Sequence, residues 1–378
     1  MPSDPRAQVA IVLRRLPEYR VALFAVLRTL LQADGVQLRL LHGEPTSQEA
    51  SRDDQGRLDW AERLPTRYLY RERFCWQPVG ASTRRADLVV MAQQEQPGYN
   101  LWALPPWGLR RYALWGRGLE EEGAVPSQRG RRFARSVVDR AVWWFVSTEP
   151  CAEKMRREGF AKERITIVEN AIDTADLAER VAAVTTSQID TGRRSLGLKG
   201  ARVALFLGSL TEDKHLPFLL QAAEQVLQRV PAFRLLIAGD GPLRAYVEQA
   251  AKSYPWLRFL GRLRGHEKAL ALRQAELVLS PGFVGLGILD AFTAGVPIVT
   301  TDRPGHGPEI AYLRSGENGL MTENTMEAYV RAVVALLQYE DERRRLGVNA
   351  QHVASHYTVE NMAQRFRTGI LGALRLKV

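Results

Sequence analysis

Short apolar runs alternate along the chain with longer stretches in which apolar residues recur every three or four positions. Runs of about four to eight aliphatic and β-branched residues are typical of buried strands, whereas the longer spacing is typical of amphipathic helices. Because parallel strands are joined through crossover helices, the alternation predicts parallel sheets covered by helices. We therefore expect an α/β fold.

The second half of the chain carries this pattern most regularly. Its predicted strands each end in a glycine, a proline or a polar turn, and they cover residues 203–207, 234–238, 257–260, 277–280 and 297–301. A helix is expected over residues 217–230, with Pro217 near its first turn, where the missing N–H leaves no hydrogen bond unmade. The second half therefore predicts a doubly wound, Rossmann-like domain.

The first half predicts a second Rossmann-like domain, with less evenly spaced strands. These strands are expected at residues 9–13, 36–41, 88–92, 111–114, 141–146 and 165–168. The domain boundary is expected within residues 175–199, because the small polar residues of segment 184–192 are typical of a linker. This gives an N-terminal domain over residues 1–183 and a C-terminal domain over residues 193–357.

Three other segments bear on the architecture. Residues 358–376 predict an amphipathic helix, which either caps the second domain or joins the first, with apolar residues at Met362, Phe366, Ile370 and Leu374. The aromatic residues 143–145 lie in an apolar run, which favours a buried strand over a membrane wedge. The arginine-rich segment 129–140 fits either a membrane-surface patch or a solvated helix face.

Composition narrows the classes of protein. The chain has 378 residues, 46% hydrophobic and 25% charged, as expected for a folded protein of two domains. No apolar run approaches the ~20 residues that cross a bilayer, and residues 1–8 lack the pattern of a secretory leader, so we expect a cytoplasmic protein. Two cysteines and six histidines, without metal-ligand spacing, predict neither a disulfide framework nor a metal site.

The net charge is +10, from 52 basic and 42 acidic residues, and it favours anionic partners. Phosphorylated small molecules and an anionic membrane surface fit this charge. Nucleic acid is not supported, because the sequence has no zinc-finger, RNP-like or heptad pattern.

Ligands of an open parallel sheet bind in the loops that follow the carboxyl ends of the strands. After the strand at 203–207 comes Gly208-Ser-Leu-Thr-Glu-Asp-Lys214-His215, which leads into the predicted helix. A lysine just ahead of a helix N-terminus adds a full charge to the partial charge of the free N–H groups, and this combination suits a phosphate. Taken alone, the lysine fits a solvated turn equally well.

The loop after the strand at 277–280 has similar features. Gly285 and Gly287 stand at the start of a predicted helix, where glycine lets a ligand approach the backbone, and Asp290 follows about one turn later. This predicts a phosphate on the backbone N–H groups and a hydroxyl group on Asp290. Tight helix–sheet packing by the glycines is the alternative. A third loop, Gly239-Asp-Gly-Pro-Leu243, follows another buried strand and is a weak signal by itself.

The order of these loops resembles the family 4 glycosyltransferases, which are retaining nucleotide-sugar enzymes of the GT-B fold. The resemblance covers residues 133–320, and it implies two Rossmann-like domains that face each other across a nucleotide-sugar cleft. The matching pieces are Leu207-Gly-Ser-Leu…Lys214, Leu236-Ile-Ala-Gly-Asp-Gly-Pro-Leu243, Phe259-Leu-Gly261, Ser280-Pro-Gly-Phe-Val-Gly-Leu286…Asp290-Ala, Gly295-Val-Pro-Ile-Val-Thr-Thr301 and Pro308-Glu-Ile310.

Three positions depart from the family pattern. Ser209 stands where the family usually has an arginine, and Gly282 stands where it has the first of two paired glutamates, the second being Asp290 here. The run Leu114-Trp-Gly-Arg-Gly118 resembles a Trp-Gly-His-Gly loop, with Arg117 in place of the histidine. A guanidinium cannot act as an acid or base near neutral pH, so Arg117 would bind phosphate or acceptor.

The resemblance implies roles for particular residues. Lys214 and Arg117 are expected to be catalytic, and Arg20, His306 and Glu309 to contact the acceptor or the sugar. Residues expected to bind the donor nucleotide are Gly208, Ser209, Lys214, Gly239, Gly261, Arg262, Gly285, Leu286, Gly287 and Asp290. No cofactor and no metal are expected.

The resemblance also implies an activity. It is the metal-independent, retaining transfer of a sugar from a nucleoside-diphosphate sugar, with a UDP-sugar favoured, to a glycan or lipid-linked acceptor. Cell-surface polysaccharide or lipopolysaccharide synthesis is the expected setting, with contact to the cytoplasmic face of a membrane. The three departures also fit a non-catalytic relative that binds sugar nucleotides, and a nucleotide-sugar epimerase of the same fold is a further alternative.

Overall fold

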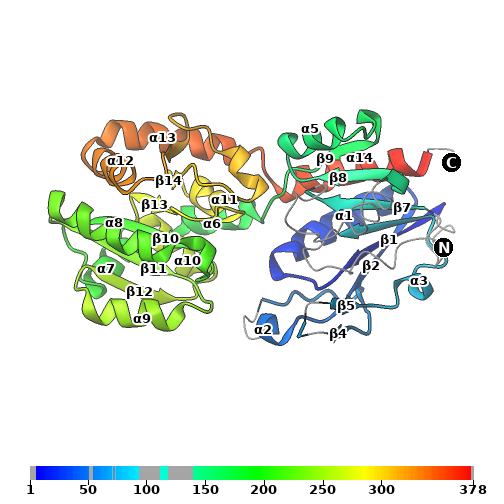
Figure 1. The fold of residues 1–378 in the computed structure, drawn as a ribbon, viewed down its shortest axis with the longest axis horizontal. Helices are drawn as coiled ribbons and strands as arrows, with labels where there is room; N and C mark the ends of the chain where they lie inside the picture. The colour runs from blue at the N-terminus through cyan, green and yellow to red at the C-terminus, as the bar shows by residue number, and fades with distance from the viewer. Residues whose placement is uncertain are drawn as a thin grey trace. The chain divides into compact units, whose positions relative to one another are not determined.

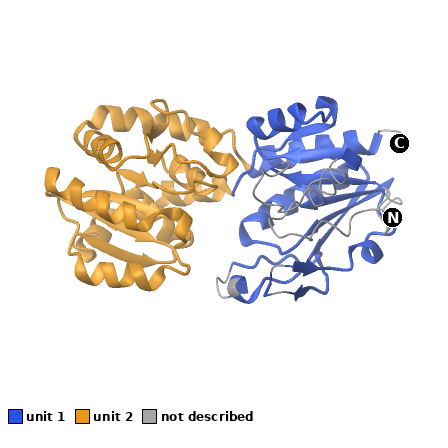
Figure 2. Cartoon of the chain, viewed as in Figure 1, with its two compact units in different colours: residues 1–172, 359–378 blue, residues 173–358 orange. Residues whose placement is uncertain are grey.

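The computed structural model describes residues 6–50, 54–69, 71–72, 74–92, 111–117 and 139–375. The chain forms two compact units (Figure 2). Unit 1 comprises residues 1–172 and 359–378, and unit 2 comprises residues 173–358. Each unit has its own parallel sheet with helices against it, as expected from the alternating pattern (Figure 1).

The sheet of unit 1 has seven strands in the order β3-β2-β1-β6-β7-β8-β9, and every neighbouring pair is parallel. The strand order reverses between β1 and β6. The strands are β1 (Ala7–Leu13), β2 (Val36–His42), β3 (Glu62–Arg63), β6 (Leu88–Ala92), β7 (Tyr112–Gly116), β8 (Trp143–Val146) and β9 (Ile165–Ile167). A separate antiparallel pair is formed by β4 (Arg67–Leu69) and β5 (Phe74–Trp76).

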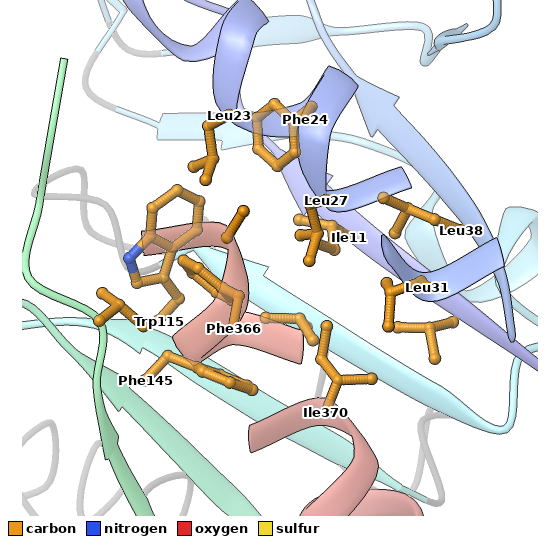
Figure 3. Close-up of a cluster of buried hydrophobic side chains, with 14 of the residues drawn as sticks. Ile11, Leu23, Phe24, Leu27, Leu31, Leu38, Trp115, Phe145, Phe366 and Ile370 are labelled. Atoms are coloured by element: carbon orange, nitrogen blue, oxygen red, sulfur yellow. The ribbon is translucent and has the colours of Figure 1, made fainter. Parts of the chain in front are cut away.

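Two helices from opposite ends of the sequence cover one face of this sheet. They are α1 (Val21–Ala33) and α14 (Val359–Arg375), and their apolar residues pack against those of β1, β7 and β8 (Figure 3). Gly369 and Gly372 let α14 lie against β8, because a Cβ on either would come within 2.6 Å of the Phe145 or Trp143 ring. The shorter helices are η1 (Glu18–Arg20), α2 (Ser47–Ala50), α3 (Val79–Ser82), α5 (Glu149–Arg157) and η3 (Lys162–Arg164).

The sheet of unit 2 has six parallel strands in the order β12-β11-β10-β13-β14-β15, and this order reverses between β10 and β13. The strands are β10 (Arg202–Leu207), β11 (Phe233–Ala238), β12 (Leu257–Gly261), β13 (Leu277–Leu279), β14 (Ile298–Thr301) and β15 (Gly319–Thr322). The helices are α6 (Thr174–Ala183), α7 (Thr186–Ser195), η4 (Glu212–Lys214), α8 (Leu216–Arg229), α9 (Arg244–Ser253), α10 (Gly265–Gln274), α11 (Gly287–Thr293), η5 (Pro308–Tyr312), α12 (Met326–Gln338) and α13 (Glu340–Ala354).

The structure differs from the sequence prediction around the domain boundary. The polar segment 184–192 was expected to be a linker, but most of it lies in α7, because Thr185 caps the helix and Gln188 completes a capping box. Helix α6 was expected in the N-terminal domain, but it packs against α10 and α11 and belongs to unit 2. The C-terminal helix joins unit 1.

Residues 143–145 are buried in β8, and residues 129–138 of the arginine-rich segment lie outside the described residues. The short strands β3, β4, β5 and β15 were not predicted.

Candidate donor site of unit 2

The candidate site lies where the strand order of unit 2 reverses. Strands β10 and β13 are neighbours, β14 pairs with β13, and all three run in the same direction. The loops that follow them therefore meet at one edge of the sheet: residues 208–215, 280–286 and 302–307. Open α/β sheets bind their ligands in the crevice at such a reversal.

Lys214 is anchored at this edge. Its Nζ donates a hydrogen bond of 2.6 Å to the backbone oxygen of Phe283, and it lies 4.6 Å from the centre of the Phe283 ring. Burial lowers the pKa of the ammonium, while the charges of Asp213 and Glu309 act in the opposite direction. Among the described residues the structure records no ion pair for Lys214. A cation that is held in place but not neutralised is suited to an anionic ligand.

Gly282 explains how the loops after β10 and β13 fit together. A Cβ at this position would lie 2.4 Å from the backbone oxygen of Asp213 and 2.3 Å from the carbonyl carbon of Lys214. The next residue, Phe283, donates its N–H to the same Asp213 oxygen at 2.8 Å. The backbone of Lys214 therefore occupies the space that a side chain at position 282 would need, and a glutamate does not fit there.

His306 is held between two backbone segments. Its Nδ1 accepts a hydrogen bond from the Val284 N–H at 3.1 Å, and its Nε2 lies 2.8 Å from the Thr301 oxygen. This arrangement requires the neutral ring protonated at Nε2, because Nδ1 must accept. Burial lowers the pKa of His306, in agreement. The expected sugar or acceptor contact is therefore not supported, because both ring nitrogens are used within the protein.

Two more charged residues stand beside Lys214. Glu309, in η5, is 5% exposed, and its carboxylate lies near Gly285 and Gly307. Arg303, which the sequence analysis did not single out, donates through Nη1 to the backbone oxygen of Asp213 at 2.6 Å. The signal for it was its place directly after β14, in the same loop as His306.

Asp290 lies in α11, and its Oδ1 forms an ion pair of 2.7 Å with Nζ of Lys268 in α10. The sequence analysis missed Lys268, because α10 gave no sign of contact with α11. Two of the other expected donor residues precede Asp290: Leu286 caps α11 and is half-buried, and Gly287 begins the helix and is exposed. An Asp290 carboxylate that also binds a ribose hydroxyl would have to share its charge with Lys268.

The remaining donor-site residues support the loop after β10 or lie farther along the sheet. Gly239 packs directly on this loop, because a Cβ there would come within 1.8 Å of the Gly208 oxygen, and its N–H donates to the Gly261 oxygen at 2.8 Å. Ser209 is exposed, with Oγ 3.3 Å from the hydroxyl of Thr211. Arg262 follows β12, the edge strand, which β11 separates from β10.

The two predicted residues of unit 1 have different surroundings. Arg117 is exposed in the bend directly after β7. Arg20 is only 8% exposed: its guanidinium stacks 4.7 Å from the Trp115 ring, and Nη2 donates to Oδ1 of Asn170 at 3.2 Å. This enclosure supports a structural role for Arg20 rather than the expected contact with an acceptor.

Basic residues also follow the first strand of unit 1. Arg14 is 7% exposed, and it donates to both carboxylate oxygens of Glu49 and to the hydroxyl of Tyr68. Arg15 pairs with Glu49 at 3.2 Å and with Asp54 at 2.8 Å. Burial alone would raise the pKa of Glu49, but the hydrogen bonds from Arg14 and Thr46 lower it to about 2. Carboxylates therefore neutralise both arginines.

Within the part of the chain that the structure describes, no group of three or more His, Cys, Asp or Glu side chains is placed to hold a metal ion. No described helix is long and apolar enough to cross a membrane.

Residues 201–339, which include the candidate site, match the family model described as "Glycosyl transferases group 1". The chain carries a group 1 glycosyltransferase domain. The expected membership of family 4 is consistent with this match. Within this glycosyltransferase domain lie all three loops around Lys214 and the pair of Asp290 and Lys268.

Curated relatives match part of the chain. Phosphatidyl-myo-inositol mannosyltransferase of Mycobacterium leprae is 32% identical over 150 residues, and the alignment covers 38% of this chain. The chain matches 39% of the length of that relative.

Solved glycosyltransferase structures match nearly the whole chain. HepE of Anabaena in complex with UDP superposes with a TM-score of 0.71 at 15% identity and covers 96% of this chain and 99% of its own. WaaG, described as a glycosyltransferase involved in lipopolysaccharide biosynthesis, gives a TM-score of 0.65 at 16% identity and covers 95% and 98%. The fold of this chain is therefore the GT-B fold, as expected.

Proposed function

We propose that this protein is a retaining, metal-independent glycosyltransferase that uses a nucleoside-diphosphate sugar. One observation carries the proposal. In the group 1 glycosyltransferase domain, the Lys214 ammonium lies at the strand reversal, bonded to the Phe283 oxygen and without a recorded carboxylate partner among the described residues. When the sugar leaves, negative charge grows on the diphosphate, and a fixed cation lowers the energy of that transition state.

The proposed reaction needs no protein nucleophile. Lys214 binds the departing diphosphate, and the acceptor hydroxyl attacks the sugar from the face that the diphosphate leaves. The hydroxyl proton passes to the donor phosphate, and the configuration at the sugar is retained. Asp290 binds a ribose hydroxyl of the donor, and unit 1 binds the acceptor.

The relatives suggest substrates for testing. HepE was solved with UDP, which supports the expected UDP-sugar donor. The name of the Mycobacterium leprae relative includes phosphatidylinositol and a mannosyl group, which supports a lipid-linked acceptor. A Mycobacterium tuberculosis relative is named as a GDP-mannose-dependent mannosyltransferase, which adds GDP-mannose as a candidate donor. The involvement of WaaG in lipopolysaccharide biosynthesis supports a role in building lipopolysaccharide or a related cell-surface glycan. A lipid-linked acceptor would bring this protein into contact with a membrane surface.

Thermal-shift measurements with UDP-, GDP-, ADP- and dTDP-sugars test donor binding. We expect one nucleotide class to raise the melting temperature, because a ligand that binds only the folded state stabilises it. Turnover with the stabilising donor and a lipid or glycan acceptor should then survive EDTA. A strict requirement for Mg²⁺ or Mn²⁺ would contradict the metal-independent mechanism.

A non-catalytic relative that binds sugar nucleotides is the second candidate. The observation in its favour is Gly282, where the backbone of Lys214 leaves no room for the glutamate that the family usually has. Both candidates predict donor binding, but only the first predicts transfer. Saturable donor binding without transfer or donor hydrolysis, across a panel of lipid and glycan acceptors, would favour the second.

Arg117 remains a proposed contact to phosphate or acceptor, because it is exposed directly after a strand of the parallel sheet of unit 1. A lysine keeps the charge but loses the planar, bidentate geometry of the guanidinium. Arg117→Lys should therefore already lower turnover, and Arg117→His should not restore it. Full activity of both variants at equal thermal stability would exclude Arg117 from the site.

A further inference from the structure

Two cations of unit 2 are anchored on the same short piece of backbone. The backbone oxygen of Asp213 accepts hydrogen bonds from the Phe283 N–H at 2.8 Å and from Nη1 of Arg303 at 2.6 Å. The neighbouring Lys214 donates its ammonium to the Phe283 oxygen at 2.6 Å. The loops after β10 and β14 therefore each supply one cation to the edge of the sheet where the loop after β13 lies.

Neither cation is neutralised by a carboxylate recorded among the described residues. Arg303 and Lys214 are both half-buried, and the bond to Asp213 leaves other N–H groups of the guanidinium for a ligand. Their charges reach the surrounding groups: burial lowers the pKa of His306, and the charges of Arg303 and Lys214 lower it further. Burial and the charge of Arg303 also lower the pKa of His215. Both cations therefore act on His306, while the charges of Asp213 on His215 and of Asp302 on His306 act in the opposite direction.

We propose that Arg303 is the second cation that binds the donor diphosphate, together with Lys214. This inference rests on the proposed function and names a residue that the family pattern of the sequence does not single out. A diphosphate carries at least two negative charges, and a guanidinium can bind two phosphate oxygens at once where an ammonium acts as a point charge. Arg303 would thus supply the guanidinium that is missing at Ser209.

Ser209 and Arg262 are less suitable than Arg303 as the second group that binds the diphosphate. Ser209 offers only a hydroxyl group, which lies 3.3 Å from that of Thr211. Arg262 follows the edge strand β12, so β11 lies between its strand and β10. Arg303 belongs to the same unit as Lys214 and contacts the residue next to it.

Calorimetric titrations with UDP, GDP, ADP and dTDP, each paired with its monophosphate, test this inference. Arg303→Ala should weaken binding of the preferred diphosphate about ten- to a hundredfold, as expected for hydrogen bonds to a charged group. The monophosphate should lose much less, because one phosphate can still bind Lys214. The diphosphate affinity of Arg303→Lys should lie between that of the parent and that of Arg303→Ala. The matched control is Arg314→Ala, an exposed arginine of unit 2 whose recorded ion pair is with Glu317, and it should bind like the parent.

A rescue experiment separates binding from loop structure. Ser209 is exposed, so Ser209→Arg can return a guanidinium to the loop after β10. In the Arg303→Ala background this second substitution should recover most of the diphosphate affinity. A structural role for Arg303 predicts instead equal losses for diphosphate and monophosphate, a lower melting temperature and no rescue, and that result would overturn the inference.

The failure of this inference and the failure of the proposed function give different results. If Lys214→Ala weakens diphosphate binding while Arg303→Ala binds like the parent, Arg303 is not a donor contact and the proposed function stands. If the parent binds none of the four diphosphates, or if Lys214→Ala and Arg303→Ala both bind like the parent, the donor site itself is misplaced and both proposals fail.

Discussion

Both parallel sheets place basic residues in the loops that follow their strands, but the groups that bind these residues differ between the two units. In unit 1, Arg14 and Arg15 follow the first strand beside the strand reversal, and both pair with the carboxylate of Glu49. In unit 2, Lys214 follows β10 at the strand reversal and Arg303 follows β14, one strand beyond it, and both donate to backbone oxygens. The first pair is neutralised within the protein, whereas for the second pair no ion pair with a carboxylate is recorded among the described residues.

This difference shows why position in the fold does not by itself identify a binding site. When a buried ion pair loses one partner, the other charge is left unpaired, which strongly destabilises the fold. The two members of such a pair are therefore not available to a ligand. A cation on a carbonyl group retains its net charge and can be neutralised by an anion. Charge compensation therefore distinguishes the structural arginines of unit 1 from the candidate donor site of unit 2.

The largest effect is expected in unit 1. Glu49→Ala leaves Arg14 and Arg15 without their shared carboxylate and should lower the free energy of unfolding by ~3–5 kcal/mol. Glu62→Ala is the control, since it breaks a more exposed pair with Arg39 and should cost less than ~1 kcal/mol. Urea unfolding measures both. A stable Glu49→Ala variant that gains affinity for inorganic phosphate would contradict the comparison and make the arginines a ligand site.

Glu49 also predicts acid sensitivity. Its pKa in the folded protein is about 2, below the ordinary value of 4.5, so its contribution to stability is complete above about pH 4.5 and is lost as the pH falls towards 2. The Glu49→Gln variant should lose less stability than the parent over that interval.

The second effect concerns turnover in unit 2. Lys214→Ala should lower kcat/KM by an amount that corresponds to ~2–4 kcal/mol of lost transition-state stabilisation, the usual range for one fixed electrostatic contact. The donor KM should rise and kcat should fall together, because the ammonium meets charge that grows during the reaction. The control is Lys252→Ala, in the last turn of α9. Unchanged steady-state kinetics of Lys214→Ala would remove the residue from the site.

The third effect tests whether Asp290 contacts the donor or only Lys268. Asp290→Asn should weaken nucleoside-diphosphate binding by ~1–3 kcal/mol if the carboxylate accepts a ribose hydroxyl. Lys268→Met removes the other member of the 2.7 Å ion pair and should change binding less. Equal losses for the two variants, measured by calorimetry, would mean that the ion pair only links α10 to α11 and that the ribose assignment is wrong.

Much of the fold could be predicted from the sequence. Strands such as β1 and β10 are continuous apolar runs, because both faces of a parallel sheet are covered by helices. The two-residue strand β3 and the three-residue strands β4 and β5 have no such run, since they are short and partly exposed. Helix α7 resembles a linker because its sequence is polar, and only its capping box marks it as a helix.

The site was predictable only in part. The place of Lys214 followed from a general rule of parallel sheets, because the loop after a strand must reach the edge where ligands bind. What surrounds it did not follow. That His306 uses both ring nitrogens and that Gly282 has no room for a side chain depend on the approach of loops from separate strands, which no local pattern records.

The smallest effect is expected from His306, whose ring joins the loop after β13 to the end of β14. Burial lowers its pKa below the ordinary value of 6.5, and the charges of Arg303 and Lys214 contribute, whereas the hydrogen bond to Thr301 and the charge of Asp302 act in the opposite direction. The unfolded chain therefore takes up a proton before the folded protein does. The contribution of this histidine is complete above about pH 6.5 and declines as the pH falls below that value.

Protonation at Nδ1 would also break the bond from the Val284 N–H and loosen the loop that carries Phe283, the partner of Lys214. The parent should thus lose both thermal stability and diphosphate affinity as the pH falls below about 6.5. At pH 7, His306→Ala should have a lower melting temperature and a lower diphosphate affinity than the parent. Both quantities should depend less on pH than they do in the parent. His352→Ala, at an exposed position of α13, is the control and should follow the parent curve. If His306→Ala has the same pH slope as the parent, the neutral ring does not hold these two loops together, and the loops of unit 2 do not need it to present their two cations.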